Sequence, residues 1–317
     1  METVLEDKSI HGTIQADSMY YQPRDTIDVV FMGSSHVHCD INTAYLWENY
    51  GLAGYDYSSA EQPLWITYYY LKEICKYQKP KLIVLDMYSP ARFKDDYQYN
   101  YLSESLQGMR FSLNKVGMIL VSCEIDRIFD YFPDIVTYHS RYSELTSEDW
   151  NAVFSSRSEK EAIKGFIPFF ARNPQIQPKL DQEKSGDITV KSEMYLQKII
   201  DYTKEQGIDL FLIVSPYVTN SNDELVYNRV HEIADRNGLR FNSTNYAFDH
   251  MNLNFEIDFA DDSHLNYWGS LKFSEYLGQE MKNNYLIPDR RGDSGWESWD
   301  RHAEQIEEKV KQYMEEE

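Results

Sequence analysis

The sequence predicts an α/β fold in which helices cover both faces of a parallel sheet. Three observations lead to this prediction. Short apolar runs have the length and bounding residues of buried parallel strands, and helical patterns alternate with these runs along the chain. Hydrophobic residues make up 42% of the 317 residues, which is enough to bury a substantial core.

Five runs are candidate strands. Residues 29–32, 82–87 and 210–214 are the clearest, because they are short and predominantly apolar. Residues 53–57 and 239–242 are weaker candidates. If all five pair in parallel, their carboxyl ends form one edge of the sheet, where open α/β folds bind ligands.

Helical patterns connect these runs. Residues 65–77 have apolar positions at helical spacing and precede a proline that would stop a helix. Residues 191–206 and 223–237 are also predicted to be helical, and they are followed by Gly207 and Gly238. Glycine adopts the left-handed conformation that closes many helices, so these two positions predict helix ends.

Two segments lie outside this alternation. Residues 92–187 are polar and rich in tyrosine, and we expect a mostly helical insertion on the carboxyl-end side of the sheet. Such an insertion would serve as a lid or a partner surface. Residues 291–317 are expected to form a charged C-terminal helical appendage, solvated rather than part of a site, while residues 1–290 form a single α/β domain.

The composition excludes several classes of function. A formal net charge of -21 would repel nucleic acid, so no nucleic-acid partner is expected. No run reaches the roughly 18 apolar residues of a membrane span, and residues 1–9 lack the apolar core of a signal peptide. Three scattered cysteines, Cys39, Cys75 and Cys123, do not make a disulfide framework.

Serine, histidine and aspartate stand where acyl transfer requires them. Ser35 follows the first predicted strand after a turn at Gly33. Asp261 and His264 are three residues apart in a loop before a predicted helix, with Asn266 as its cap. A serine hydroxyl attacks only when a base removes its proton, and a carboxylate orients that base. The sequence therefore predicts Ser35 as nucleophile, His264 as general base and Asp261 as the orienting carboxylate.

These residues resemble the SGNH (GDSL-like) hydrolase superfamily, specifically its divergent bacterial branch in which Gly-Ser-Ser replaces Gly-Asp-Ser. That branch includes proteins similar to the D-alanyl transfer protein and to alginate-type polysaccharide O-acetyltransferases. The resemblance implies a flavodoxin-like three-layer α/β/α sandwich, the same three catalytic residues, and no metal or organic cofactor. Its spacing favours Asp261 over the neighbouring Asp262. It extends over residues 25–286 and is strongest in segments 28–36, 56–71, 79–90, 210–217 and 261–269.

The oxyanion donors depart from the pattern of the superfamily. Ser58 stands where a glycine normally follows the second strand, and its backbone N–H remains a candidate donor. The asparagine that usually follows the third strand is missing, and Tyr88 or Gln62 is a candidate substitute. His36, next to Ser35, is expected to line the pocket.

Other histidines have simpler interpretations. His36, His38 and Cys39 lie close together, but their spacing matches no common zinc site, so structural or pocket-lining roles are expected. His139 is expected to be an ordinary hydrogen-bonded loop histidine that does not take part in catalysis.

The leading functional prediction is an esterase or O-acyltransferase that handles a small acyl group, with acetyl the expected one, on a carbohydrate or cell-envelope polymer. A membrane-bound acyl donor is a candidate partner, and the oligomeric state is left open. The alternative is a glycan-binding or scaffold protein that has the fold without the chemistry. A thioesterase or lipase acting on long acyl chains is disfavoured, because it needs a large apolar pocket.

The resemblance also bears on location. Members of this branch are usually tethered outside the cytoplasmic membrane by an N-terminal helix. We therefore expect an extracytoplasmic, membrane-anchored protein whose anchor is absent from this sequence, with a cytoplasmic protein as the alternative.

Overall fold

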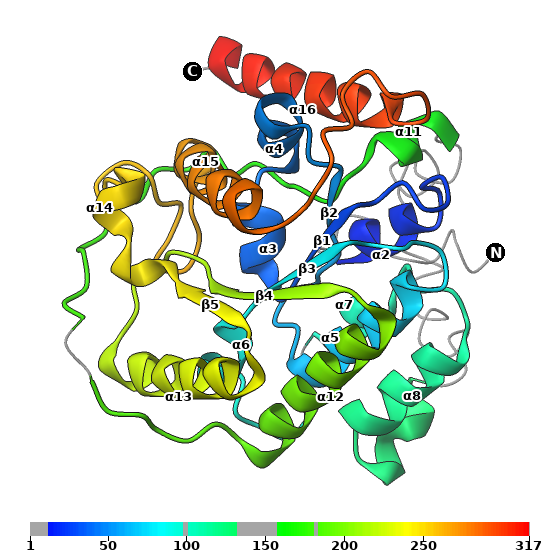
Figure 1. Cartoon of the computed structure of the whole chain (residues 1–317), viewed down its shortest axis with the longest axis vertical. Helices are drawn as coiled ribbons and strands as arrows, with labels where there is room; N and C mark the ends of the chain where they lie inside the picture. The colour runs from blue at the N-terminus through cyan, green and yellow to red at the C-terminus, as the bar shows by residue number, and fades with distance from the viewer. Residues whose placement is uncertain (1–11, 98–100, 132–156, 181–182, 317) are drawn as a thin grey trace.

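The computed structural model describes residues 12–97, 101–131, 157–180 and 183–316. Five parallel strands form one sheet in the order β2-β1-β3-β4-β5, and helices flank it (Figure 1). The α/β prediction is thus confirmed, including both weaker strand candidates. The strands are β1 Val29–Met32, β2 Gly54–Asp56, β3 Leu82–Asp86, β4 Asp209–Val214 and β5 Arg240–Ser243.

The strand order places the first strand at a functionally important position. From β1 the chain pairs β2 on one side, and then crosses to β3, β4 and β5 on the other. The direction of winding therefore reverses between β1 and β3. In open α/β sheets, ligands bind outside the carboxyl ends of the strands at such a reversal. Residues that directly follow β1 lie at this point.

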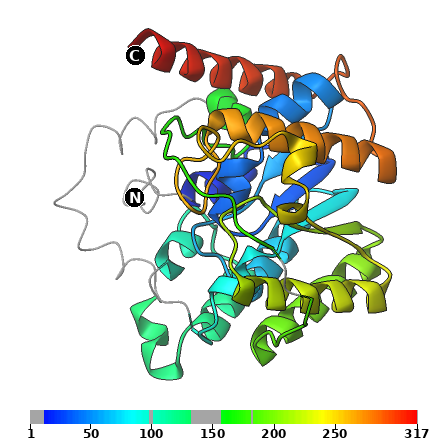
Figure 2. The same cartoon turned by 90° about the vertical axis from the view of Figure 1, so that its left-hand side faces the viewer.

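The sheet separates two hydrophobic clusters, because alternate residues of a strand point to opposite faces. Val29 and Phe31 pack in one cluster, whereas Val30 and Met32 pack in the other. Figure 2 shows α15 on one side of the sheet, and α12 and α13 on the opposite side. The first cluster is covered by α3 Ser35–Asp40, α4 Thr43–Tyr50, α14 Phe248–Met251 and α15 Tyr267–Asn284. The second is covered by α5 Leu64–Ile74, α12 Val190–Gln206 and α13 Ser221–Asn237.

The predicted helix ends are confirmed. Gly207 and Gly238 close α12 and α13 in the left-handed conformation, each with φ of 67°. Asn266 caps α15, since its side chain accepts hydrogen bonds from the backbone N–H groups of Trp268 and Gly269. These ends depend on interactions within one helical turn, so local sequence is sufficient to predict them.

The insertion is helical only in part. Its described helices are α7 Leu102–Leu106, α8 Leu113–Ser122, the short 3-10 helix η1 Ile125–Asp130, and α11 Arg157–Ala162, while α6 Tyr88–Arg92 ends where the insertion begins. Residues 163–180 form no helix, contrary to the expectation, because Pro168, Pro174 and Pro178 interrupt the segment. This segment returns to the sheet edge, where the Ile167 N–H donates to the carbonyl of His38.

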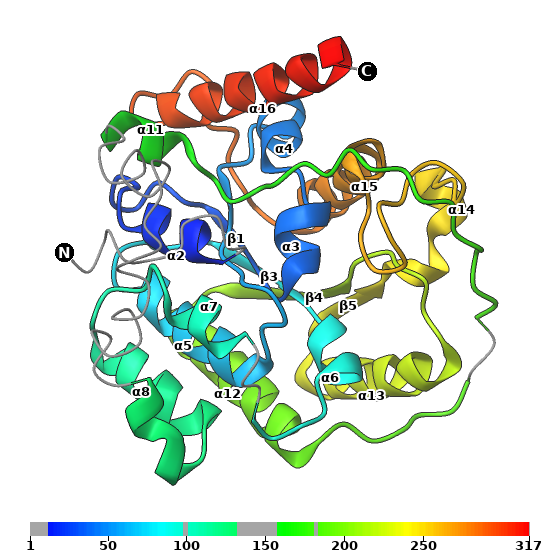
Figure 3. The same ribbon diagram turned by 180° about the vertical axis from the view of Figure 1, so that it is seen from behind.

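The C-terminal helix is not the solvated appendage that we expected. The first half of α16, Glu297–Glu316, packs along α4, as Figures 1 and 3 show. Trp299 is fully buried, its indole N–H donates to the carbonyl of Gly54, and the Lys164 ammonium lies 3.6 Å from its ring centroid. Trp299, Ala303 and Ile306 recur at helical spacing, so they form a buried stripe. The first half of the helix is therefore part of the core, whereas most residues after Ile306 are exposed, as expected of an appendage.

Candidate active site

A sharp turn places Ser35 at the carboxyl edge of the sheet. β1 ends at Met32, and α3 begins at Ser35. Gly33 between them has a φ of 149°, which side chains rarely tolerate. A Cβ atom at this position would lie 2.9 Å from the Cβ of Asp86 on the neighbouring strand. Glycine thus permits the strand to turn directly into the helix and present the serine at the rim.

The loop before α15 holds the aspartate and the histidine. Phe259 and Leu265 form an isolated antiparallel bridge across this loop. Within it, Asp261 Oδ1 accepts hydrogen bonds from the backbone N–H groups of Ser263 and His264, both at 2.8 Å. These local hydrogen bonds hold the aspartate beside the histidine.

The fold brings the three predicted residues together. Ser35 Oγ lies 2.8 Å from His264 Nε2, although the residues are 229 positions apart. His264 Nδ1 lies 3.0 Å from each carboxylate oxygen of Asp261. Asp262 is exposed, and its carboxylate accepts a hydrogen bond from Ser263 Oγ at 3.4 Å rather than one from His264. The serine hydroxyl, the imidazole and the Asp261 carboxylate thus form one hydrogen-bonded chain.

Electrostatics keep Asp261 ionised. Partial burial by itself would raise its pKa, but the hydrogen bond and the electrostatic interaction with the His264 imidazole and the two backbone N–H donors have the opposite effect. The net result is a pKa below the usual value for aspartate. An ionised carboxylate at this position stabilises a protonated imidazole and orients its other nitrogen toward the serine.

A second carboxylate, which the sequence analysis did not identify, connects the two halves of the site. Asp40 Oδ1 in α3 accepts the backbone N–H of Leu265 at 2.9 Å, and Leu265 directly follows His264. Asp40 is fully buried, and burial raises its pKa well above the usual value. The only sequence sign of this role is an acidic residue within an otherwise buried short helix.

A cavity of about 600 Å³ opens over these residues. One wall carries Ser35 and His264, and the others come from the loop after β2, from α6 and from the insertion. The ring of Phe169 lies edge-on to His264, with centroids 5.9 Å apart. Besides Ser35, His264 and Asp261, the lining residues are Cys39, Ala60, Glu61, Tyr88, Phe93, Tyr101, Glu104, Phe169 and Ser263.

Two candidate oxyanion residues use their side chains elsewhere. Ser58 Oγ lies 2.9 Å from His38 Nδ1, so only its backbone remains a candidate donor. Phe31 pairs with Asp56 at the end of β2, and Ser58 follows two residues later, beyond the carboxyl end of that strand. Gln62 does not line the cavity, contrary to the prediction, because its amide donates to Thr67 and accepts from Ser59.

Tyr88 and His36 form a layer beside His264. Tyr88 lines the cavity, and its hydroxyl lies 3.3 Å from Ser263 Oγ. His36 was expected to line the pocket, but it is fully buried behind Tyr88, with ring centroids 3.8 Å apart. Burial, followed by the charges of His264, Arg92 and His38, lowers the pKa of His36 well below its usual value. His36 is therefore a neutral packing residue.

Among the residues that the structure describes, no three His, Cys, Asp or Glu side chains are grouped so as to hold a metal ion. His36, His38 and Cys39 diverge: the first packs on Tyr88, the second contacts Ser58, and the third lines the cavity. His139 lies outside the described residues. Within the described ranges, no helix is both long and apolar enough to cross a bilayer.

The chain was compared with known proteins. No protein-family model and no curated protein matched it. The function proposed below therefore rests on the geometry of the site.

Proposed function

We propose that this chain is a serine-dependent esterase or O-acyltransferase that forms an acyl-enzyme on Ser35. The observation that carries the proposal is the chain of hydrogen bonds from Ser35 Oγ through His264 to Asp261, with distances of 2.8 and 3.0 Å. These are the distances required for proton transfer between a nucleophile and its base.

The reaction proceeds in two halves. Ser35 Oγ attacks the ester carbonyl while His264 Nε2 takes its proton, and Asp261 stabilises the resulting imidazolium. The tetrahedral intermediate expels the alcohol, which receives the proton from His264, and the acyl group remains on Ser35. Water or a sugar hydroxyl then attacks the acyl-enzyme, with His264 again as the base. The backbone N–H groups of Ser35 and Ser58 are the proposed oxyanion donors.

The cavity favours a small acyl group on a polar acceptor. Aromatic side chains and carboxylates share its lining, including Tyr101, Phe169 and Glu61. Aromatic rings with polar edges suit a carbohydrate surface, whereas a long acyl chain requires an extended apolar channel. We therefore propose an acetyl-type ester of a carbohydrate or envelope polymer as substrate, with a membrane-bound acyl donor in the transferase case.

We further propose that the fold is of the SGNH hydrolase type. The strand order β2-β1-β3-β4-β5 is the flavodoxin-like order. A serine directly after the first strand and an Asp-x-x-His loop directly before a long helix support the same assignment.

The experiment compares Ser35→Ala with Ser34→Ala. Ser34 is the neighbouring buried serine, and its hydroxyl has no hydrogen-bond partner in the described part of the chain, so it controls for loss of a hydroxyl. We expect a chromogenic acetate ester to give a burst, and a fluorophosphonate probe to label the protein. Both should be lost in Ser35→Ala and kept in Ser34→Ala. An unchanged rate in Ser35→Ala would refute the proposal.

A glycan-binding protein without turnover is the second candidate. It is favoured by the segment Asp86-Met87-Tyr88, which lacks the asparagine that follows the third strand in the superfamily it resembles. In that case glycan binding would survive Ser35→Ala, no ester would be turned over, and the wild-type protein would resist the fluorophosphonate probe.

A further inference from the structure

A second hollow lies at the opposite end of the sheet from Ser35. Lys81 directly precedes β3, and Arg290 follows α15, so the hollow lies at the amino ends of the strands. Its volume is about 550 Å³. Three of its lining residues are cationic, and none is a carboxylate. The lining residues are Lys81, Lys282, Tyr285, Leu286, Ile287, Pro288 and Arg290.

Three cations around one hollow are unexpected in this chain. The sequence has 31 Lys and Arg residues against 52 Asp and Glu residues, so its surface field is strongly negative. Side chains of like charge repel one another, so they gather around one hollow only where an anion offsets the repulsion. Their convergence at this one place is therefore a feature that needs a physical cause.

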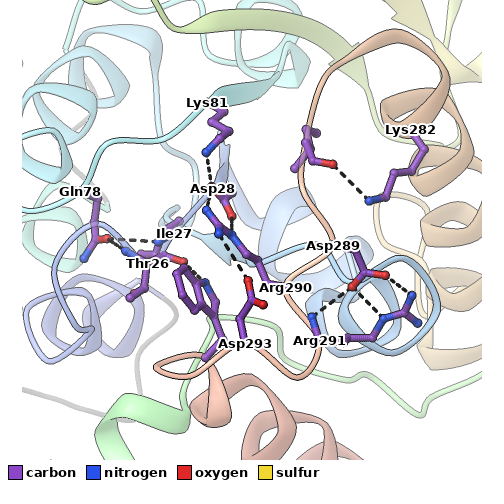
Figure 4. A network of polar contacts seen from close by, with 12 residues as sticks. Thr26, Ile27, Asp28, Gln78, Lys81, Lys282, Asp289, Arg290, Arg291 and Asp293 are labelled. Atoms are coloured by element: carbon purple, nitrogen blue, oxygen red, sulfur yellow. Dashed lines mark hydrogen bonds and ion pairs between the residues drawn. The ribbon is translucent and has the colours of Figure 1, made fainter.

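Asp28 accounts for part of the convergence. Its buried carboxylate accepts from Lys81 Nζ at 3.0 Å, and from Arg290 Nε and Nη2 at 2.7 and 3.2 Å. Figure 4 shows both cationic side chains directed at Asp28. Arg290 is held further by the ring of Trp296, 4.3 Å from its guanidinium carbon. Arg290 Nη1 also lies 3.5 Å from Asp293 Oδ2, so two carboxylates match these two cations, and the positive charge in excess comes from Lys282.

Lys282 adds a further cation. Its ammonium donates to the carbonyl of Ile287 at 3.3 Å, which uses one of its three donors. Burial lowers its pKa; Asp289 and Asp28 oppose this effect, and Arg291 adds to it. Asp289 pairs with Arg291, whose Nε donates to Asp289 Oδ1 at 3.0 Å (Figure 4). An anion beside Lys282 would stabilise its charged form.

We propose that this hollow binds the phosphate group of an anionic ligand. A phosphate presents several acceptor oxygens, and it matches cations that converge from different elements better than a single carboxylate does. Within the described ranges, Lys81 Nζ and Lys282 Nζ each make one hydrogen bond, so both ammonium groups have further N–H donors for a ligand, and Arg290 supplies a guanidinium already fixed in place. The rim is apolar, with Leu286 96% exposed, and suits the organic part of a phosphate ester or of a lipid headgroup. The inference is independent of the proposed esterase activity.

The test measures binding of inorganic phosphate to the whole chain by 31P NMR titration at low ionic strength. Lys81→Gln and Lys282→Gln each remove one cation of the hollow while leaving Arg290 bound to Asp28. Lys79→Gln is the matched control, because Lys79 is 82% exposed, pairs with Asp25 and does not line the hollow. Thermal unfolding of each variant verifies that the fold is kept.

We expect saturable binding that weakens by about fivefold or more in Lys81→Gln and Lys282→Gln, and by less than about twofold in Lys79→Gln. Equal weakening in all three variants, or no saturable binding in the wild type, would overturn the proposal. Sedimentation with phosphatidylglycerol and phosphatidylcholine vesicles then separates the two sources. Binding to the anionic vesicles that is lost in Lys282→Gln identifies a headgroup, whereas phosphate binding without vesicle binding identifies a soluble phosphate compound.

Discussion

Replacing Asp40 tests whether the site depends on one buried hydrogen bond. Asp40 Oδ1 accepts the N–H of Leu265 at 2.9 Å, so it joins the helix that begins at Ser35 to the loop that carries His264. In Asp40→Ala the Leu265 N–H loses this acceptor in a buried place, which costs about 1 to 3 kcal/mol of stability. The loop is then free to shift His264 relative to the serine.

The effect on reactivity follows from the geometry. The Ser35 to His264 hydrogen bond is 2.8 Å, and a displacement of about 1 Å costs about 100-fold in rate. We therefore expect Asp40→Ala to be labelled by a fluorophosphonate about 10 to 100 times more slowly than the wild type. Asp40→Asn keeps an acceptor for Leu265, and it should be labelled within about threefold of the wild-type rate.

The two variants also differ in their dependence on pH. Burial raises the pKa of Asp40, so the folded state retains a proton that the unfolded state has released. The stability of the wild type therefore falls as pH rises from the unfolded pKa of about 4 toward the raised folded value. Asparagine cannot ionise, so Asp40→Asn should gain stability relative to the wild type over this range. Urea unfolding at several pH values measures the difference.

Two outcomes would refute this reasoning. Labelling of Asp40→Ala at the wild-type rate would show that Asp40 does not position His264. Equal slowing in Asp40→Asn and Asp40→Ala would show that the hydrogen-bond acceptor for Leu265 is not the property of Asp40 that matters.

Two further predictions concern α16. Trp299→Ala should lower the free energy of unfolding by about 3 to 5 kcal/mol in urea, because the side chain is fully buried, while labelling of Ser35 stays near the wild-type rate; a loss below about 1 kcal/mol would mean that the helix is peripheral. His302 is buried against Thr43, and burial, with smaller effects from neighbouring lysines, lowers its pKa to about 3. As the pH falls, the unfolded state therefore binds a proton that the folded state does not bind. The free energy of unfolding decreases by about 2 kcal/mol between pH 7 and pH 5. His302→Gln should be correspondingly less sensitive to acid than the wild type in thermal unfolding, whereas the exposed control His231→Gln should match the wild type.

Local sequence was sufficient for the strands, the helix ends and the residues of the hydrogen-bonded chain. The run Val29–Met32 is buried on both faces, so its apolar character is visible without knowing its partners. Gly207 and Asn266 act within one turn of their own helices. Asp261 and His264 are three residues apart and interact through a local loop.

Local sequence did not predict the hydrogen-bond and packing partners of polar side chains near the site. Gln62 was a candidate for the pocket, but Ser59 and Thr67 take its amide. His36 adjoins Ser35 in sequence, yet the turn of α3 directs it into the core behind Tyr88. A polar side chain near a site has several available acceptors, and only the packed structure determines which one it meets.

The sequence by itself predicted the five strands and the helices that connect them, although not the irregular segment 163–180, and it pointed to Ser35, Asp261 and His264. Tertiary structure alone decided that Ser35 and His264 meet, that Asp40 joins their two segments, and that Lys81, Lys282 and Arg290 surround one hollow. The physical reason is the distance along the chain over which each interaction acts. Secondary structure depends on neighbours within a few residues. Contacts between residues more than 200 positions apart depend on the spatial order of the strands in the sheet, and no local pattern specifies that order.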